Sequence, residues 1–140
     1  MSWDSYIDNL ISQSKDASGT THASKAAIIG IDGGAPWTTA GHANAIKGNP
    51  SEYAAIAKCF KSGDFGSMMA SGIHLEGIKF QFLRVEDGKI VFGKKKDHGA
   101  CTLQASKTAI VIGLTPEGGQ QGNCNKAVSV IAEYLESLGM

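Results

Sequence analysis

Hydrophobic residues at the start of the chain recur with helical spacing and include two large aromatic side chains. At about 100° per residue, residues 2–12 place their apolar side chains within one arc of roughly 140°. These side chains are Trp3, Tyr6, Ile7, Leu10 and Ile11. With Ser2 as the N-cap and Asp4 in the first turn, the pattern predicts a helix that begins at the first residues. An aromatic residue on an apolar helical face is ordinarily part of a core, so this helix alone favours packing over binding for Trp3 and Tyr6.

Short apolar and alternating segments predict β-strands through the middle of the chain. Residues 25–31 run into a glycine-rich turn, and residues 37–40 are expected to complete a hairpin, which places Trp37 near the start of a strand. Further strands are expected at residues 78–85, 89–93, 100–106 and 108–114. Their connections are too short for helical crossovers, so the sheet should be antiparallel. In the first of these strands, one face is expected to carry Ile78, Phe80 and Phe82, and the other Lys79, Gln81 and Leu83.

Two further helices and one short helical turn are expected. Asn49 as N-cap and Pro50 at the first helical position begin one helix, and a helical turn follows around Met68. The end of the chain carries a long helix with one apolar stripe, formed by Cys124, Val128, Ile131, Leu135 and Leu138. Tyr134 lies in a neighbouring row, beside the core rather than in it.

The order of these elements predicts an α+β domain over residues 1–140, in which helices flank a central antiparallel sheet. The two terminal helices each have an apolar face to bury. If they pack together on one face of the sheet, they bring four aromatic side chains close to one another. These are Trp3, Tyr6, Trp37 and Tyr134.

Composition narrows the classes of function. Thirteen basic and thirteen acidic residues give a net charge of zero, which argues against nucleic-acid binding. Three cysteines without CxxC spacing argue against a disulfide framework and against a structural zinc site. The sequence has neither a secretion signal nor a stretch long enough for a transmembrane segment, so we expect a soluble intracellular protein.

The residue types needed for catalysis or metal binding do not form a recognisable constellation. The histidines His22, His42, His74 and His98 lie in or near predicted loops without a metal-ligand motif, and we expect them to be exposed there. The glycine-rich loop 118–122 precedes the last helix but lacks the Gly-Lys-Ser/Thr ending of a phosphate loop. We therefore expect a binding protein rather than an enzyme, with no cofactor and no metal.

Residues 94–96 are three consecutive lysines, the densest charge in the chain. Lys79, Arg84 and Lys126 could converge with them on one edge of the sheet. A run of charge is most often a solvated face. If this one binds a partner, an acidic protein or a phosphoinositide head group suits it better than a nucleic-acid duplex.

Several segments together resemble the profilin family. They are residues 2–10 (SWDSYIDNL), residues 26–30 (AAIIG) followed by Trp37, and Asn125-Lys126 before a helix with Tyr134-Leu135. The resemblance implies a monomer of the cytoplasm and cytoskeleton that binds monomeric actin, captures proline-rich proteins such as formins and is displaced by phosphoinositides. It also implies control of actin polymerisation and of nucleotide exchange on actin. The alternative is a small-molecule or lipid sensor domain with a similar sheet, in which Trp37 helps to line a pocket.

The resemblance implies two sets of site residues. The family's proline-binding groove lies between the terminal helices, at positions that match Trp3, Tyr6, Trp37 and Tyr134. A polyproline II helix is already extended, so aromatic rings can hold it at little cost in ordering entropy. The family's actin-binding surface lies on the opposite side, at positions that match Lys79, Arg84, Lys94, Lys96, Gln120, Asn125 and Lys126. Many animal members carry histidine at the position of Tyr134.

Overall fold

A six-stranded antiparallel sheet forms the centre of the protein, as seen in the computed structural model, which describes residues 3–39 and 41–140. Its strands are β1 (Lys25–Gly30), β2 (Ile73–Leu75), β3 (Ile78–Glu86), β4 (Ile90–Lys95), β5 (Gly99–Ala105) and β6 (Ala109–Thr115). They lie in the order β1-β6-β5-β4-β3-β2, and every neighbouring pair is antiparallel. The helices are α1 (Ser5–Gln13), α2 (Pro50–Ser62), α3 (Gly66–Ser71) and α4 (Gln121–Ser137). The predicted α+β fold is therefore confirmed.

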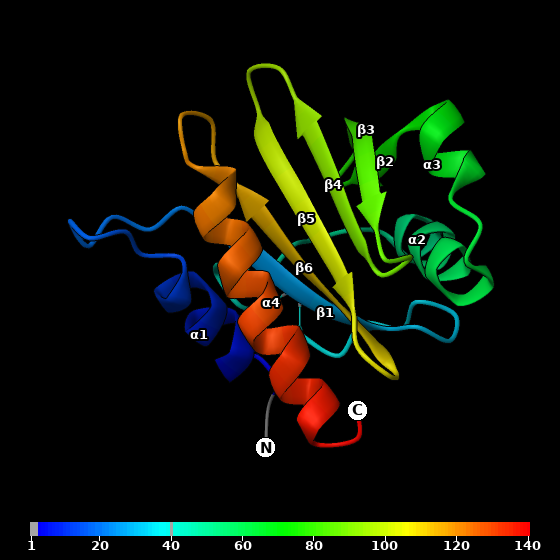
Figure 1. Cartoon of the computed structure of the whole chain (residues 1–140), viewed down its shortest axis with the longest axis horizontal. Helices are drawn as coiled ribbons and strands as arrows, with labels where there is room; N and C mark the ends of the chain where they lie inside the picture. The colour runs from blue at the N-terminus through cyan, green and yellow to red at the C-terminus, as the bar shows by residue number, and fades with distance from the viewer. Residues whose placement is uncertain (1–2, 40) are drawn as a thin grey trace.

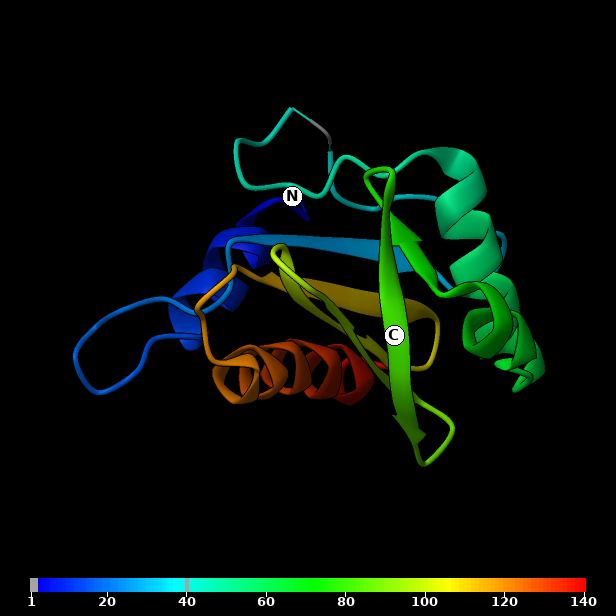
Figure 2. The same cartoon turned by 90° about the horizontal axis from the view of Figure 1, so that it is seen from above.

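The helices cover the sheet in two pairs. The terminal helices α1 and α4 lie side by side in front of β1, β5 and β6, as predicted (Figure 1). Figure 2 shows α2 on the other side of the sheet from α4. Because successive strand residues point to opposite faces, Ile28 and Val111 pack under α1 and α4, whereas Ile29 and Ile110 belong to the core under α2 and α3. The two faces thus have separate hydrophobic cores.

Helix α2 has the termini that its sequence predicts. The Asn49 side chain accepts a hydrogen bond from the Glu52 N–H at 2.9 Å, and the Glu52 carboxylate accepts one from the Asn49 N–H at 3.0 Å. This capping box, with Pro50 in the first turn, satisfies N–H groups that a helix start leaves without partners. Gly63 ends the helix in the left-handed conformation that glycine adopts without strain.

Helix α4 approaches the sheet closely at Gly113 in the middle of β6. A Cβ atom at this position would lie 2.8 Å from Val128 Cγ2 and 2.9 Å from Cys124 Sγ. Glycine inside a strand often marks such a close approach.

The thiols of Cys59, Cys101 and Cys124 are free and buried, and burial raises the pKa of Cys101 and Cys124. Both of these thiols therefore stay protonated at neutral pH.

The first helix begins later than the sequence predicts. Helix α1 starts at Ser5, and Asp4 occupies the N-cap position without a side-chain hydrogen bond to the helix. The Asp4 carboxylate instead accepts hydrogen bonds from the backbone N–H and the hydroxyl of Thr39. Ser2, the predicted N-cap, lies outside the described residues.

The predicted second strand at residues 37–40 is wrong where the structure describes it. Pro36 forms only an isolated bridge with Ile29. Trp37 lies in a bend, and its N–H donates to the Ile28 carbonyl at 2.7 Å. Proline has no N–H to donate to a ladder, so the segment does not continue as a strand. Position 40 lies outside the described residues.

Two smaller differences concern element ends. The three-residue strand β2 was not predicted, because so short a segment shows no periodicity of its own. Leu138 was predicted in the buried stripe of the last helix, but it follows the last residue of α4 and is 52% exposed. The other four stripe residues are buried, so the predicted orientation of α4 is correct.

Candidate functional site

Four aromatic side chains form a continuous surface row, here called the aromatic strip: Trp3, Tyr6, Trp37 and Tyr134. The Trp3 ring lies 4.9 Å from Trp37 and stacks on Tyr6 at 5.3 Å, measured between ring centroids. Tyr6 in turn lies 6.1 Å from Tyr134. Three segments that are distant in the sequence therefore contribute to one row, and the structure brings together all four predicted positions.

The strip lies along the contact between α1 and α4. Ile7 and Leu10 of α1 are buried against α4, which fixes the direction in which Trp3 and Tyr6 point. Trp3, Tyr6 and Trp37 are only partly buried, and Tyr134 is 50% exposed. Burial and the neighbouring Tyr134 raise the pKa of Tyr6, so its hydroxyl remains a hydrogen-bond donor at neutral pH. The strip offers both ring faces and donors to a ligand.

Two tethers hold the Trp37 loop against α1. Thr39 donates its N–H to Asp4 Oδ1 at 2.7 Å, and His42 Nε2 lies 3.0 Å from Asp8 Oδ1. His42 Nδ1 accepts the Asn44 N–H at 2.9 Å, which makes Nε2 the donor toward Asp8 in the neutral ring. Sequence reasoning missed these positioning residues; the spacing of Asp4 and Asp8 by one helical turn was the available signal.

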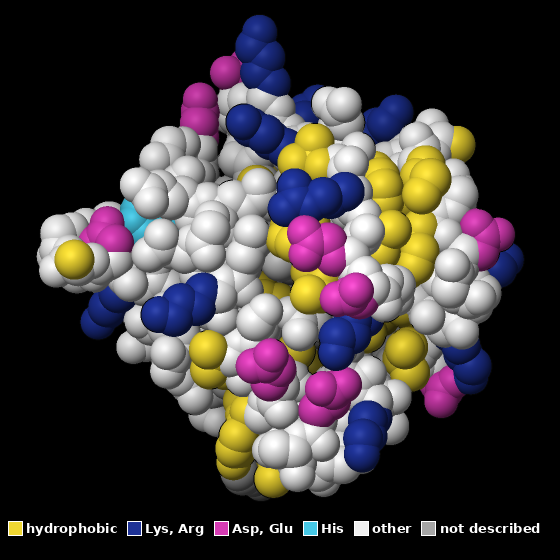
Figure 3. Space-filling model, in the orientation of Figure 1, with side chains coloured by type: hydrophobic (Ala, Val, Ile, Leu, Met, Phe, Trp, Pro, Cys, Tyr) yellow, Lys and Arg dark blue, Asp and Glu magenta, His cyan; other side chains and the backbone are white. Residues whose placement is uncertain are grey.

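A basic surface lies at the end of the sheet where β4 turns into β5. Lys79, Lys94 and Lys96 are exposed and line an open hollow of about 520 Å³ together with Met69 and Phe82. Met69 is 61% exposed. Figure 3 shows dark blue side chains gathered at this end of the face that carries α4, close to exposed hydrophobic atoms. The predicted lysines thus lie beside apolar side chains that the sequence alone did not point to.

A β-bulge determines which face Arg84 occupies. The register between β3 and β4 shifts between Phe82, which pairs with Gly93, and Arg84, which pairs with Phe92. The sequence predicted strict alternation of side chains along this strand, with Leu83 on the same face as Lys79, and the bulge interrupts that alternation. An extra residue moves every later side chain to the opposite face. Arg84 consequently shares the α4 side of the sheet with Lys79, whereas strict alternation would have separated them.

The remaining predicted residues lie at the start of α4. Asn125 accepts a hydrogen bond from the hydroxyl of Thr102 in β5, and Lys126 is exposed. Gln120 is the N-cap residue, with an exposed side chain. A second open hollow of about 500 Å³ extends from residues 94–96 to the loop before α4. The structure therefore brings the lysines and the start of α4 to the same end of the molecule.

His22 is buried, contrary to the expectation that it is an exposed loop residue. It is 7% exposed, its Nδ1 accepts the Gln120 N–H at 3.0 Å, and its Nε2 lies 2.8 Å from Asp16 Oδ2. Hydrogen bonds from the Ser18 hydroxyl, from His22 and from the Thr20 N–H lower the pKa of Asp16. These hydrogen bonds of His22 attach the loop that precedes β1 to the start of α4.

Within 3–39 and 41–140, no group of three or more His, Cys, Asp or Glu side chains is arranged to hold a metal ion. Over the same residues, none of the helices is both long and apolar enough to span a bilayer.

These features define a small α+β binding module. Its aromatic strip lies between the terminal helices, and its basic surface lies toward the turn between β4 and β5. The family model of profilin matches residues 1–140. Profilin of Clypeaster japonicus is 73% identical over 140 residues and covers all of both chains. The chain belongs to the profilin family of actin-binding proteins.

Solved structures have the same fold. The crystal structure of Acanthamoeba castellanii profilin II matches with a TM-score of 0.80 at 31% identity, over 99% of this chain and 100% of that one. Mouse profilin IIa in complex with a double repeat from the FH1 domain of mDia1 matches with a TM-score of 0.71 at 24% identity, over 100% of both chains.

Proposed function

We propose that this protein binds monomeric actin through the basic surface and proline-rich segments through the aromatic strip. It thereby regulates actin polymerisation as a binding protein of the cytoskeleton. Membership of the profilin family makes actin the partner to test first. The observation that carries the proposal is the aromatic strip itself, in which four partly exposed rings from three segments lie in one row.

The aromatic strip suits a polyproline II segment for two physical reasons. Proline rings present flat apolar faces that pack on aromatic rings, and the PPII conformation is already extended before binding. Because proline has no N–H, its carbonyls remain available to accept from the indole and phenol donors of the strip. Proline-rich proteins such as formins are the proposed source of such segments. The FH1 double repeat bound by mouse profilin IIa is a suitable second probe after a proline decamer.

The basic surface suits an acidic patch on actin. Exposed lysines beside the exposed side chain of Met69 combine long-range attraction with an apolar contact. Phosphoinositide head groups would compete for the same lysines, because phosphates also bind exposed cationic side chains. Acceleration of nucleotide exchange would follow if binding favours a more open conformation of actin.

The two surfaces lie on different parts of the molecule. The strip lies where the ends of α1 and α4 meet, whereas the basic surface lies toward the turn between β4 and β5 (Figure 1). One molecule could therefore carry actin while it is attached to a proline-rich protein. Such tethering raises the local concentration of actin at a growing filament end.

The small-molecule alternative receives less support. The hollow between α2, α3 and β2 has a volume of about 180 Å³, whereas pockets for drug-sized ligands measure roughly 300–1,000 Å³. The two larger hollows, of about 500 and 520 Å³, are open and are both lined by the lysines of residues 94–96, which suits a charged partner better than an apolar ligand. Trp37 does not line it but packs on Trp3 at the surface. A bound apolar ligand in the purified protein would nevertheless revive this alternative.

Charge reversal tests the actin proposal. The double variant Lys94→Glu/Lys96→Glu should bind monomeric actin at least about tenfold more weakly, mainly through slower association that depends on salt. Lys107→Glu, an exposed lysine in the turn between β5 and β6 at the other end of the sheet, is the matched control. Equal affinity of the double variant and the wild type would refute the basic surface as the actin site. Failure of the wild type to bind actin would refute the proposed function.

A further inference from the structure

The buried ring of Phe92 belongs to neither hydrophobic core. Phe92 is 6% exposed, yet it is absent from both clusters of core residues in the described chain. It lies on β4 on the side of the sheet that carries α4, where it pairs directly with Arg84 of β3. The Arg84 guanidinium carbon lies 4.4 Å from the centre of the ring. A charged side chain therefore covers an aromatic residue that the apolar cores do not use.

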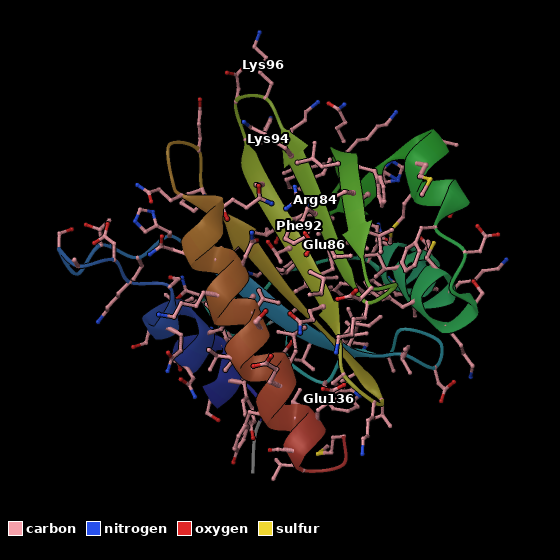
Figure 4. The ribbon with its side chains drawn as sticks, viewed as in Figure 1. Arg84, Glu86, Phe92, Lys94, Lys96 and Glu136 are labelled. Atoms are coloured by element: carbon pink, nitrogen blue, oxygen red, sulfur yellow. The ribbon has the colours of Figure 1, made fainter. Side chains whose placement is uncertain are left out.

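Arg84 is held from two directions. The Arg84 guanidinium carbon lies over the Phe92 ring, and Arg84 Nε donates to Glu86 Oε1 at 2.9 Å. Glu86 is on the same face because it lies two residues further along the same strand. Figure 4 shows Arg84, Glu86 and Phe92 together in the middle of this face. Lys94 and Lys96 lie further along it, toward the turn between β4 and β5.

The contacts of Arg84 leave its outer edge available. Its side chain is 60% exposed, and its two terminal nitrogens have no hydrogen-bond partner among residues 3–39 and 41–140. These nitrogens form the fork that binds a carboxylate with two parallel hydrogen bonds. An exposed ion pair such as Arg84–Glu86 contributes little by itself, so the Phe92 ring beneath the guanidinium is the main contact that restrains the fork.

We propose that Phe92 is a positioning residue for partner binding: its ring orients the Arg84 guanidinium so that the terminal nitrogens grip a carboxylate on actin. The bulge at Leu83 is part of this arrangement, because it places Arg84 opposite Phe92 instead of on the α2 side. The inference rests on the proposed actin binding. It adds that the affinity of this surface depends on an aromatic residue that does not itself touch the partner.

A double-mutant cycle tests the coupling between the two residues. Arg84→Ala and Phe92→Leu should each weaken actin binding by about five- to tenfold, since the orienting cation–π contact is lost in both. The double variant should bind no more weakly than Arg84→Ala alone. Phe92→Tyr keeps the ring and should stay within about twofold of the wild type. Phe60→Leu, at an equally buried ring in the α2 core, is the matched control and should leave the affinity unchanged.

Nuclear magnetic resonance of the Arg84 side chain supplies a readout that needs no actin. In the wild type the Arg84 Nε–H should show a ring-shifted, slowly exchanging signal, and Phe92→Leu should return it to the position of a free arginine. A free-arginine signal in the wild type would overturn the inference, as would additive losses in the cycle. The wild type could also fail to bind actin while its Arg84 Nε–H signal shows restraint. That result would refute the proposed function and the role of Phe92 in actin binding, and it would leave only the orientation of Arg84 by Phe92 supported.

Discussion

Replacing Trp3 by alanine should separate binding from folding at the aromatic strip. Trp3 occupies an inner position of the row of four rings, with its neighbours at 5.3 Å (Tyr6) and 4.9 Å (Trp37). The variant removes the surface that connects α1 to the Trp37 loop. It leaves the buried residues Ile7 and Leu10, which attach α1 to α4, unchanged.

The expected magnitudes follow from these contacts. Two aromatic pairs, each contributing about 0.5–1.5 kcal/mol, are lost from the free protein, so its stability should fall by about 1–3 kcal/mol. Trp3 is only partly buried, so the loss should stay below the roughly 3–5 kcal/mol typical of a fully buried tryptophan. A tryptophan at the centre of an interface commonly contributes at least about 2 kcal/mol to binding, which corresponds to a roughly 30-fold weaker affinity for a proline decamer.

Calorimetric titration with the decamer measures the affinity, and thermal unfolding monitored by circular dichroism verifies that the variant is folded. Leu83→Ala is the control, because Leu83 is a 44% exposed apolar residue on β3, away from the strip. Trp3→Phe keeps an aromatic ring and should give an intermediate affinity. A folded Trp3→Ala variant with the affinity of the wild type would refute the groove, and equal weakening by Leu83→Ala would refute its location.

Three other perturbations have defined outcomes. The pKa of Asp16 is lowered in the fold, so its hydrogen bonds stabilise the protein at neutral pH and are lost as the carboxylate is protonated. Asp16→Ala should therefore lower the melting temperature at pH 7, with a gap to the wild type that narrows below about pH 4. Gly113→Ala should cost about 1–3 kcal/mol in urea unfolding, since its Cβ would lie 2.8 Å from Val128 Cγ2; an unchanged midpoint would contradict this. His42→Ala breaks the tether to Asp8 and should weaken decamer binding about two- to fivefold with little loss of stability, as measured by calorimetry.

The helical parts of the candidate site could be predicted from the sequence. Periodicity places Trp3 and Tyr6 on the same face of α1, and the stripe of α4 places Tyr134 beside it, because side chains on a helix repeat every 3.6 residues whatever their partners. The packing of α1 beside α4 could also be predicted, because each helix has an apolar face that must be buried. This local rule explains why the proximity of Trp3, Tyr6 and Tyr134 was predicted correctly although these residues come from opposite ends of the chain.

The β-sheet parts were harder to predict because their determinants are not local. Nothing in the residues around Leu83 distinguishes a bulge from a regular strand, and only the pairing with β4 reveals the change of face. The hydrogen bond from the Gln120 N–H to His22 joins segments far apart in sequence, so no local pattern indicates it. Pro36, directly before the expected second strand, is a local signal against that strand, because proline has no N–H to donate to a sheet.

The two candidate surfaces are separated by distance along the α4 side of the molecule. The aromatic strip lies where the ends of α1 and α4 meet, whereas Lys94 and Lys96 lie toward the turn between β4 and β5 (Figure 4). Side-chain changes at distant positions that share no partner have independent effects. Variants at the strip should therefore spare actin binding. That independence is what a protein needs if it is to hold a proline-rich segment and an actin subunit at the same time.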